Sequence, residues 1–138
     1  MPMPSYWLLK TEPDEYSFDQ LVADRRTVWD GVANNLALQH LRKMKTGDKV
    51  LFYHTGNERA VVGIAEVIKN PYPDPNLKDK KRVVVNIKPD RKLPHAVALA
   101  DIKSNETFKD FDLIKIPRLS VMPVKAIYWN TILSMGGL

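Results

Sequence analysis

Aromatic side chains stand beside turns at two places in this chain of 138 residues. Trp29 comes directly before Asp30-Gly31, a pair typical of turns, so we expect its indole where the backbone bends. Tyr53 and His54 end an apolar run that is typical of a strand, just before a turn that begins at Thr55. Rings at the ends of elements, beside polar neighbours, form slots for planar ligands, although most such rings fill the core. Two interpretations therefore stay open: a planar-ligand pocket or core packing.

A second set, Lys10-Thr11-Glu12, has residue types that can do covalent chemistry. A desolvated lysine beside a carboxylate and a hydroxyl supports amide or imine chemistry. Consecutive residues of a strand point to opposite faces, which disfavours joint action by the three. We therefore interpret this tripeptide as a polar strand end and expect no catalytic residue.

The residues that common metal sites, phosphate-binding loops and nucleophilic catalysis require do not occur in the needed patterns. The chain has no cysteine, which excludes disulfides, thiolate metal sites and a cysteine nucleophile. Its three histidines, His40, His54 and His95, share no metal-ligand spacing, and no glycine-rich phosphate loop or serine nucleophile elbow occurs. We expect neither a metal nor a cofactor.

Positive charge is concentrated in two segments. The formal net charge is +5, and residues 78–92 carry seven lysines and arginines against Asp79 and Asp90. Four more basic residues, Arg42, Lys43, Lys45 and Lys49, surround Gly47. Such runs contact phosphate in nucleic-acid-binding proteins, but they also form solvated loops and protect strand edges. Both interpretations stay open.

Hydrophobic patterning predicts a mixed α+β fold. We expect strands at 6–10, 49–54, 60–68, 82–87 and 111–116, and a rigid loop at Tyr72-Pro73-Asp74-Pro75. We expect helices after a Ser17 cap, at 36–44 capped by Asn34 or Asn35, at 99–103 and at 125–135. Five to six short strands with three to four helices predict a small curved sheet or a partial mixed β-barrel, flanked by helices.

Length and the first residues bound the remaining expectations. One domain spanning 1–138 fits this length. No basic and apolar secretory signal opens the chain, and no apolar run is long enough to cross a membrane. We expect a cytoplasmic protein without a membrane partner, and the sequence does not predict an oligomeric state.

The motifs, taken in order, resemble the EVE-domain family along nearly the whole chain. They are Tyr6-Trp7-Leu8-Leu9-Lys10-Thr11-Glu12-Pro13, Trp29-Asp30-Gly31-Val32 with Asn34, Gly47-Asp48 with 52–55, 63–67, 72–75, 118–124 and 135–137. The resemblance implies a PUA-like fold related to YTH domains, which enclose methyladenosine of RNA in an aromatic cage. It also implies a reader of modified bases, including modified cytosine in DNA.

The resemblance further implies a site. Trp29 is the implied cage wall, Gly31 a position of close backbone approach and Asn34 the mouth. The implied floor is 10–12, the neighbouring strand adds 53–55, 118–120 forms the opposite rim, and Tyr72 lies on a closing loop. The implied ligand residues are Lys10, Thr11, Glu12, Trp29, Gly31, Asn34, Tyr53, His54, Thr55, Tyr72, Arg118, Leu119 and Ser120.

Two positions depart from the family pattern. Members often carry arginine where this chain has Ala33 and Leu38. Their role toward phosphate or a stacked base is then expected of Lys10, Arg118 or the lysine-rich strand.

The leading hypothesis is a non-enzymatic module that binds DNA or RNA and encloses a methylated or hydroxymethylated base. One alternative is a hydrolase of an acylated nucleoside, similar to ASCH domains, with Lys10, Thr11 and Glu12 as its residues. Another is a pocket for a free small metabolite. Product formation separates the hydrolase from the reader.

Overall fold

The computed structural model describes residues 4–138, so the first three residues of the expected domain lie outside the described residues. Six strands form one mixed sheet in the order β2-β5-β4-β3-β1-β6. Their bounds are β1 (Tyr6–Thr11), β2 (Thr27–Trp29), β3 (Lys49–His54), β4 (Ala60–Pro73), β5 (Val83–Ala98) and β6 (Val121–Val124). β1 and β3 are parallel, and all other neighbours are antiparallel. Within the described chain β2 and β6 do not pair, so the sheet is open, which agrees with the expected curved sheet or partial barrel.

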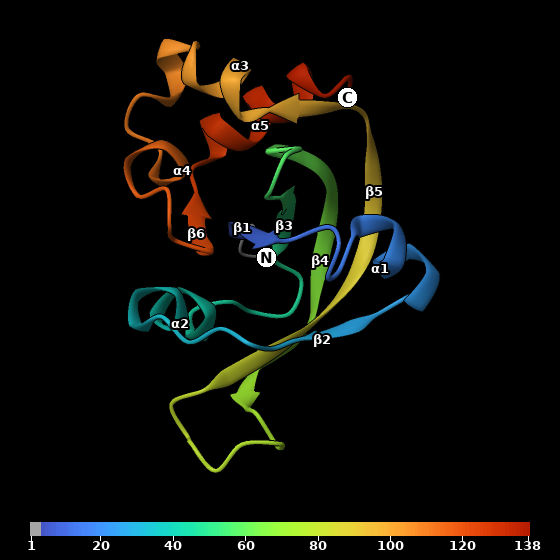
Figure 1. The fold of residues 1–138 in the computed structure, drawn as a ribbon, viewed down its shortest axis with the longest axis vertical. Helices are drawn as coiled ribbons and strands as arrows, with labels where there is room; N and C mark the ends of the chain where they lie inside the picture. Colours follow the sequence, from blue (N-terminus) through green and yellow to red (C-terminus); the bar gives the residue numbers. More distant parts are fainter. Residues whose placement is uncertain (1–3) are drawn as a thin grey trace.

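Five α-helices flank the sheet, one more than the upper expectation. They are α1 (Phe18–Asp24), α2 (Asn35–Arg42), α3 (Leu99–Lys103), α4 (Asp112–Lys115) and α5 (Ala126–Met135), with a 3-10 turn at Glu106–Phe108. Ser17 caps α1 and Asn34 caps α2, each accepting a hydrogen bond of 3.0 Å from a backbone N–H of the first turn. Figure 1 shows α3, α4 and α5 together at one end of the molecule and the β4–β5 loop at the other.

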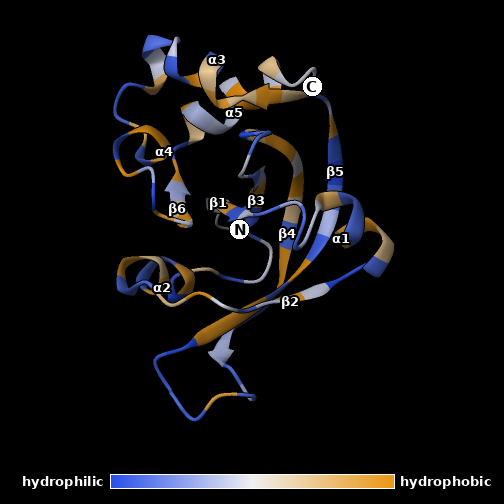
Figure 2. Cartoon of the chain, in the orientation of Figure 1, coloured by the Kyte–Doolittle hydropathy of each residue, from blue (hydrophilic) through white to orange (hydrophobic). Residues whose placement is uncertain are grey.

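The core explains why the central strands read as continuous apolar runs. Trp7, Leu8 and Leu9 of β1 are all buried, as is nearly all of β3, because helices and loops cover both faces of the middle of the sheet. Figure 2 shows β4 largely hydrophobic along its length and the β4–β5 loop mostly hydrophilic. No helix in the described part of the chain is long and apolar enough to cross a membrane.

The strand expected at 111–116 is wrong, and β6 was not expected. Residues 112–115 form α4, with Phe111 and Leu113 buried. Burial two residues apart mimics strand alternation, and so short an apolar run does not distinguish the two structures. β6 contains Pro123, which argues against a strand, but it lies at the edge of the sheet, where proline is tolerated.

The loop expected from Tyr72 is also partly wrong. Tyr72 and Pro73 are the last residues of β4 and pair with Val84 and Val83 of β5. Beyond Glu66 the strand β4 is no longer paired with β3. Pro71 and Pro73, which lack a backbone N–H, are therefore tolerated there, because no neighbouring strand needs that donor on this side. The two strands therefore extend as a hairpin past the rest of the sheet, and Asp74 and Pro75 begin its loop.

Candidate nucleobase site

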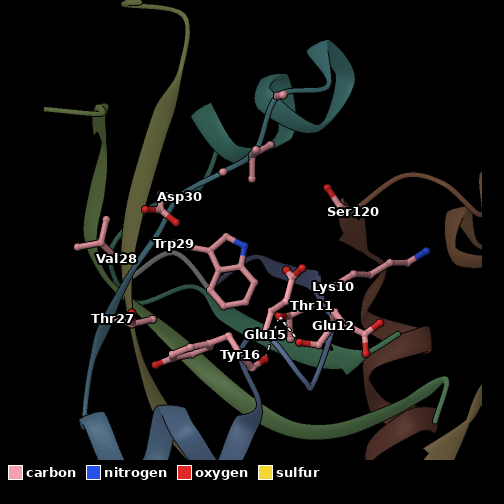
Figure 3. A pocket seen from close by; sticks show the side chains of 13 residues that line it. Lys10, Thr11, Glu12, Glu15, Tyr16, Thr27, Val28, Trp29, Asp30 and Ser120 are labelled. Atoms are coloured by element: carbon pink, nitrogen blue, oxygen red, sulfur yellow. Dashed lines mark hydrogen bonds between the residues drawn. The ribbon is translucent and has the colours of Figure 1, made fainter. Parts of the chain in front are cut away.

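A cavity of about 600 Å³ lies where β1 and β2 end and β6 begins. Three segments line it: the end of β1 with the turn that follows, β2 with the loop after it, and Ser120 (Figure 3). The lining residues are Lys10, Thr11, Glu12, Glu15, Tyr16, Thr27, Val28, Trp29, Asp30, Gly31, Val32, Ala33 and Ser120. A volume of this size falls in the range of small-molecule pockets.

Trp29 is the last residue of β2, and its side chain is only 8% exposed. Its indole meets Tyr16 edge-on, with ring centroids 6.2 Å apart, and Phe52 edge-on at 5.4 Å. In Figure 3 the indole lies between Tyr16 and the end of β1. The strand ends at this residue, as the turn signal after it predicted, and the pairing of Trp29 with Val85 fixes its position. The same ring therefore belongs to the cavity wall and to the core.

The indole N–H of Trp29 forms no hydrogen bond with any side chain drawn around the cavity, whereas the N–H of Trp7 donates to Asp48 at 2.9 Å. Every fully enclosed side-chain nitrogen and oxygen of the described residues has a partner. The N–H of Trp29 is consequently reachable from the cavity. A buried ring with a free donor is a group that a ligand acceptor can satisfy.

The side chains of Lys10, Thr11 and Glu12 bond to three different partners. Lys10 Nζ donates to the Pro117 carbonyl at 2.8 Å, and burial lowers the pKa of this amine. Thr11 Oγ1 donates to the Tyr16 carbonyl at 2.9 Å, and the Glu12 carboxylate accepts from Thr55 Oγ1 at 3.3 Å. These bonds hold separate segments around the cavity, and they do not join the three groups into a proton relay.

Gly31 lines the cavity with a φ of 78°, in the left-handed region. A Cβ on this residue would meet no atom within 4 Å. The backbone conformation of the loop, and not crowding, is therefore what favours glycine here. Ser120 faces the cavity from the opposite side, beside a backbone bond of 3.0 Å from Lys10 N to Ser120 O.

Three implied site residues support the site from behind. Tyr53 is buried, with Lys10 Nζ 5.6 Å from its ring centroid. His54 Nε2 accepts from the Phe18 backbone N–H at 3.0 Å, and its Nδ1 lies 2.6 Å from a Glu58 carboxylate oxygen. Thr55 holds Glu12, as described above. All three lie outside the cavity lining.

The remaining implied residues are also not among the lining. Asn34 directs its side chain to the start of α2, Leu119 is buried, and Arg118 is exposed. Tyr72 lies on the β4–β5 hairpin, where its hydroxyl donates to Asn86 at 2.6 Å. The structure thus brings Lys10, Thr11, Glu12, Trp29, Gly31 and Ser120 together and places the other seven elsewhere.

Seven of the lining residues were not predicted from the sequence, and of these Glu15, Tyr16, Thr27 and Asp30 carry polar side-chain groups. The backbone N–H groups of Glu15 and Tyr16 both donate to the Glu12 carbonyl, so the chain folds back after β1. Pro13-Asp14 is a turn signal that could have indicated this return. For Asp30 the sequence predicted only a place in the turn after Trp29.

The cavity is acidic. Its lining holds one cation, Lys10, against the carboxylates of Glu12, Glu15 and Asp30. Carboxylates accept hydrogen bonds and repel phosphate. The lining therefore suits a planar group with donor atoms better than it suits a polyanion.

The departures from the family pattern also have a structural reading. Ala33 lines the cavity, and Leu38 is 2% exposed within the core. An arginine in place of Leu38 would place a charge among apolar side chains of this chain.

A mixed six-stranded sheet flanked by helices, with an aromatic-walled cavity at its strand ends, defines a PUA-like α+β protein. The EVE domain family model matches residues 5–135, and this chain belongs to that family.

Two relatives illustrate the likeness. A solved structure from Rhodopseudomonas palustris is 42% identical, with a TM-score of 0.92, covering 96% of this chain and 93% of the other. Human thymocyte nuclear protein 1 is 28% identical over 96% of this chain and 74% of its own length. That human protein has a crystal structure in complex with DNA containing 5-methylcytosine, with a TM-score of 0.90 to this chain, covering 97% of this chain and 98% of the crystallised one.

An ASCH protein from Zymomonas mobilis is 9% identical with a TM-score of 0.57, covering 95% of each chain. At that identity the likeness concerns the fold alone.

Proposed function

We propose that this protein binds DNA and encloses a 5-modified cytosine, such as 5-methylcytosine, in the cavity at Trp29. The observation that carries the proposal is the buried indole of Trp29, whose N–H reaches an acidic cavity and has no hydrogen-bond partner among residues 4–138. The choice of ligand is supported by the similarity of this chain to human thymocyte nuclear protein 1, which was crystallised with DNA containing 5-methylcytosine.

Cytosine matches the groups on the cavity wall. Its exocyclic amine is a donor that aspartate and glutamate accept, and Glu12, Glu15 and Asp30 offer such acceptors. Its ring nitrogen and carbonyl are acceptors, which the Trp29 N–H can satisfy. Thymine, which presents an acceptor where cytosine carries the amine, would leave a carboxylate facing an oxygen.

The base must leave the DNA stack to enter the cavity. Enclosing a base from duplex DNA costs a few kcal/mol of unstacking and unpairing. Contacts to the rest of the DNA have to offset that cost, so the free nucleoside is expected to bind more weakly than the oligonucleotide.

The test compares oligonucleotides that differ only in one 5-methyl group. Fluorescence anisotropy gives the Kd for methylated and unmethylated DNA, with an RNA of the same sequence alongside. In Trp29→Phe a ring is kept against Tyr16 and Phe52 while the N–H is removed, and we expect the affinity for methylated DNA to fall at least fivefold. The matched control is Trp129→Phe. The indole of Trp129, in α5, stacks on Tyr6 of β1 and does not line the cavity, so this variant should bind like wild type.

Equal affinity of the wild-type protein for methylated and unmethylated DNA overturns the proposal. Tighter binding of a free nucleoside than of the oligonucleotide would favour the small-metabolite alternative. Release of product from an acylated cytidine would favour the hydrolase. The separate hydrogen bonds of Lys10, Thr11 and Glu12 give that alternative no support.

Two broader expectations belong to this proposal. One sheet and one hydrophobic core cluster support a single-domain organisation over the expected 1–138. A cytoplasmic location stays a prediction, which cell fractionation with an antibody to the native protein checks.

A further inference from the structure

Eight lysines and arginines from three separate segments of the chain gather at the hairpin end of the molecule. We call this surface the basic end. It comes from the end of α2 and the loop after it, from β4, and from the β4–β5 loop. Its members are Arg42, Lys43, Lys45, Lys69, Lys78, Lys80, Lys81 and Arg82.

Hydrogen bonds join these segments. Arg42 Nη2 donates to the Lys81 carbonyl at 2.6 Å, which ties the end of α2 to the hairpin loop. The backbone N–H of Thr46 donates to Asn70 Oδ1 at 2.8 Å, which brings the neighbours Lys45 and Lys69 to one place. The hairpin loop projects beyond the sheet, mostly hydrophilic in Figure 2.

The charge of the basic end is only partly offset, because its eight cations face two carboxylates of the hairpin loop, Asp74 and Asp79. None of its eight cations is in a salt bridge within residues 4–138, whereas Lys49, Lys88 and Lys92 pair with Glu66, Asp90 or Asp19. The two carboxylates of the hairpin loop serve the turn itself. Asp74 Oδ1 accepts from the Asn76 backbone N–H and Asp79 Oδ1 from that of Lys81.

Protection of a strand edge accounts at most for Lys69, which lies on the part of β4 beyond its pairing with β3. Lysines discourage edge-to-edge pairing when they lie on the strand that is exposed. Lys78, Lys80 and Lys81 lie in the loop between strands, while Arg42, Lys43 and Lys45 belong to α2 and the loop after it. Like charges held together repel, so an unbalanced cluster lowers stability unless an anion binds it.

α2 connects the cavity to the basic end. It is capped by Asn34, next to the cavity residue Ala33, and it ends at Arg42. Eight helical residues span about 12 Å at 1.5 Å each. Phosphates of one DNA strand are spaced about 3.4 Å along the axis, so the length of α2, from the cavity side to Arg42, corresponds to about three to four phosphates.

We propose that the basic end holds the DNA backbone beside the base that the cavity encloses. The inference rests on the proposed function for the choice of DNA, but it assigns a separate surface and a separate interaction. An acidic cavity supplies selectivity for a base and little attraction for phosphate. The basic end supplies the attraction, and it takes the role that arginines at positions 33 and 38 would otherwise have.

The test measures how the affinity for a methylated duplex changes with salt concentration. Lys78, Lys80 and Lys81 are all exposed, and their side chains make no hydrogen bond to any residue of 4–138. A triple variant with glutamine at these three positions removes three positive charges. The matched control replaces Lys103, Lys109 and Lys115 by glutamine, exposed residues at the α3–α4 end, and removes the same charge.

We expect the hairpin triple variant to lower the slope of log K against log salt by up to about three units, about one per lost phosphate contact. The control triple variant should change it by less than one unit. The ratio of affinities for methylated and unmethylated DNA should stay at the wild-type value in both. Equal effects of the two triple variants on the slope, or no effect of the first, overturn the inference.

The two proposals fail in different ways. A wild-type protein with no preference for methylated DNA, but with a salt slope that depends on the hairpin lysines, contradicts the base site and supports the basic end. A wild-type protein that prefers methylated DNA, but whose salt slope does not change when those lysines are replaced, supports the base site and contradicts the basic end. A wild-type protein that binds no DNA contradicts both.

Discussion

The ring of Trp29 meets the ring of Phe52 edge-on, with centroids 5.4 Å apart and planes at 78°. Phe52 is fully buried in β3 and meets Phe18 edge-on at 5.3 Å. The wall of the cavity is thus the outermost of three packed rings that continue into the core. A change in this row is expected to affect both stability and ligand binding, and the variants below separate the two.

Trp29→Ala should destabilise the fold as well as abolish recognition of the base. Replacing a buried tryptophan by alanine costs about 3–5 kcal/mol, because transfer free energy is lost and a cavity is left. Urea unfolding followed by circular dichroism measures the loss. Val28→Ala, at an exposed neighbouring position of β2, is the control and should change stability by less than about 0.5 kcal/mol. A fully stable Trp29→Ala variant would show that the ring does not belong to the core.

Asn34→Ala should lower stability by about 1 kcal/mol with little effect on base preference, because the side chain caps α2 and does not line the cavity. Asn34→Asp keeps a capping oxygen and should restore most of the stability. Chemical denaturation and the anisotropy assay together check this. Loss of methyl preference in both variants, at unchanged stability, would instead place Asn34 at the ligand.

Gly63→Ala should be destabilising by about 1–3 kcal/mol, because the new Cβ would lie 2.6 Å from Phe18 Cε1, in a core without room to yield. Displacement of Phe18 should pass to Phe52 and Trp29, so DNA affinity should fall as well. Adding Phe18→Leu makes space and should recover part of the stability. A double-mutant cycle measures the coupling, and independent, additive effects would contradict it.

Glu66→Gln should lower stability at neutral pH and have little effect in acid. A hydrogen bond from Lys49 is the largest cause that lowers the pKa of the Glu66 carboxyl in the folded protein. Its contribution is therefore present above the ordinary carboxyl pKa of about 4.3 and is lost as pH falls through the lower folded value. For a partly exposed pair we expect less than about 1 kcal/mol.

Unfolding free energies of wild type and Glu66→Gln, measured from pH 7 down to pH 3, should converge at the acid end. Glu106→Gln, at an exposed position of the 3-10 turn, should show no such pH-dependent difference. A difference that stays constant across this range would mean that the loss is one of packing and not of charge.

Elements with a local physical cause were predictable from the sequence. Ser17 and Asn34 cap the helices that follow them, and the apolar run 49–54 forms β3, because capping residues and hydrophobic periodicity act over a few neighbouring positions. The fold class followed from the order of such elements. The identity of β6 depended on where the sheet ends, which no local pattern contains.

The site was predictable where its residues share a segment with an aromatic or a motif residue. Trp29, Gly31 and Lys10 line the cavity, and their contact with a ligand stays a prediction. Tyr16 was missed because the chain folds back on itself after β1, and Tyr72 was expected near the ligand although its strand extends away from the cavity. In both cases the path of the backbone in three dimensions decides whether the residue lies near the cavity, and the spacing of residues in the sequence does not contain that path.

The hydrogen bond from Lys10 Nζ to the Pro117 carbonyl, together with Ser120 on the rim, closes the cavity with residues 107 or more positions apart. During synthesis on a ribosome, the first strands emerge long before the segment that completes the site. Contacts this distant in sequence form late and slow folding. A nascent or truncated chain ending before β6 should therefore have no ligand affinity, because the segment that completes the cavity would be missing.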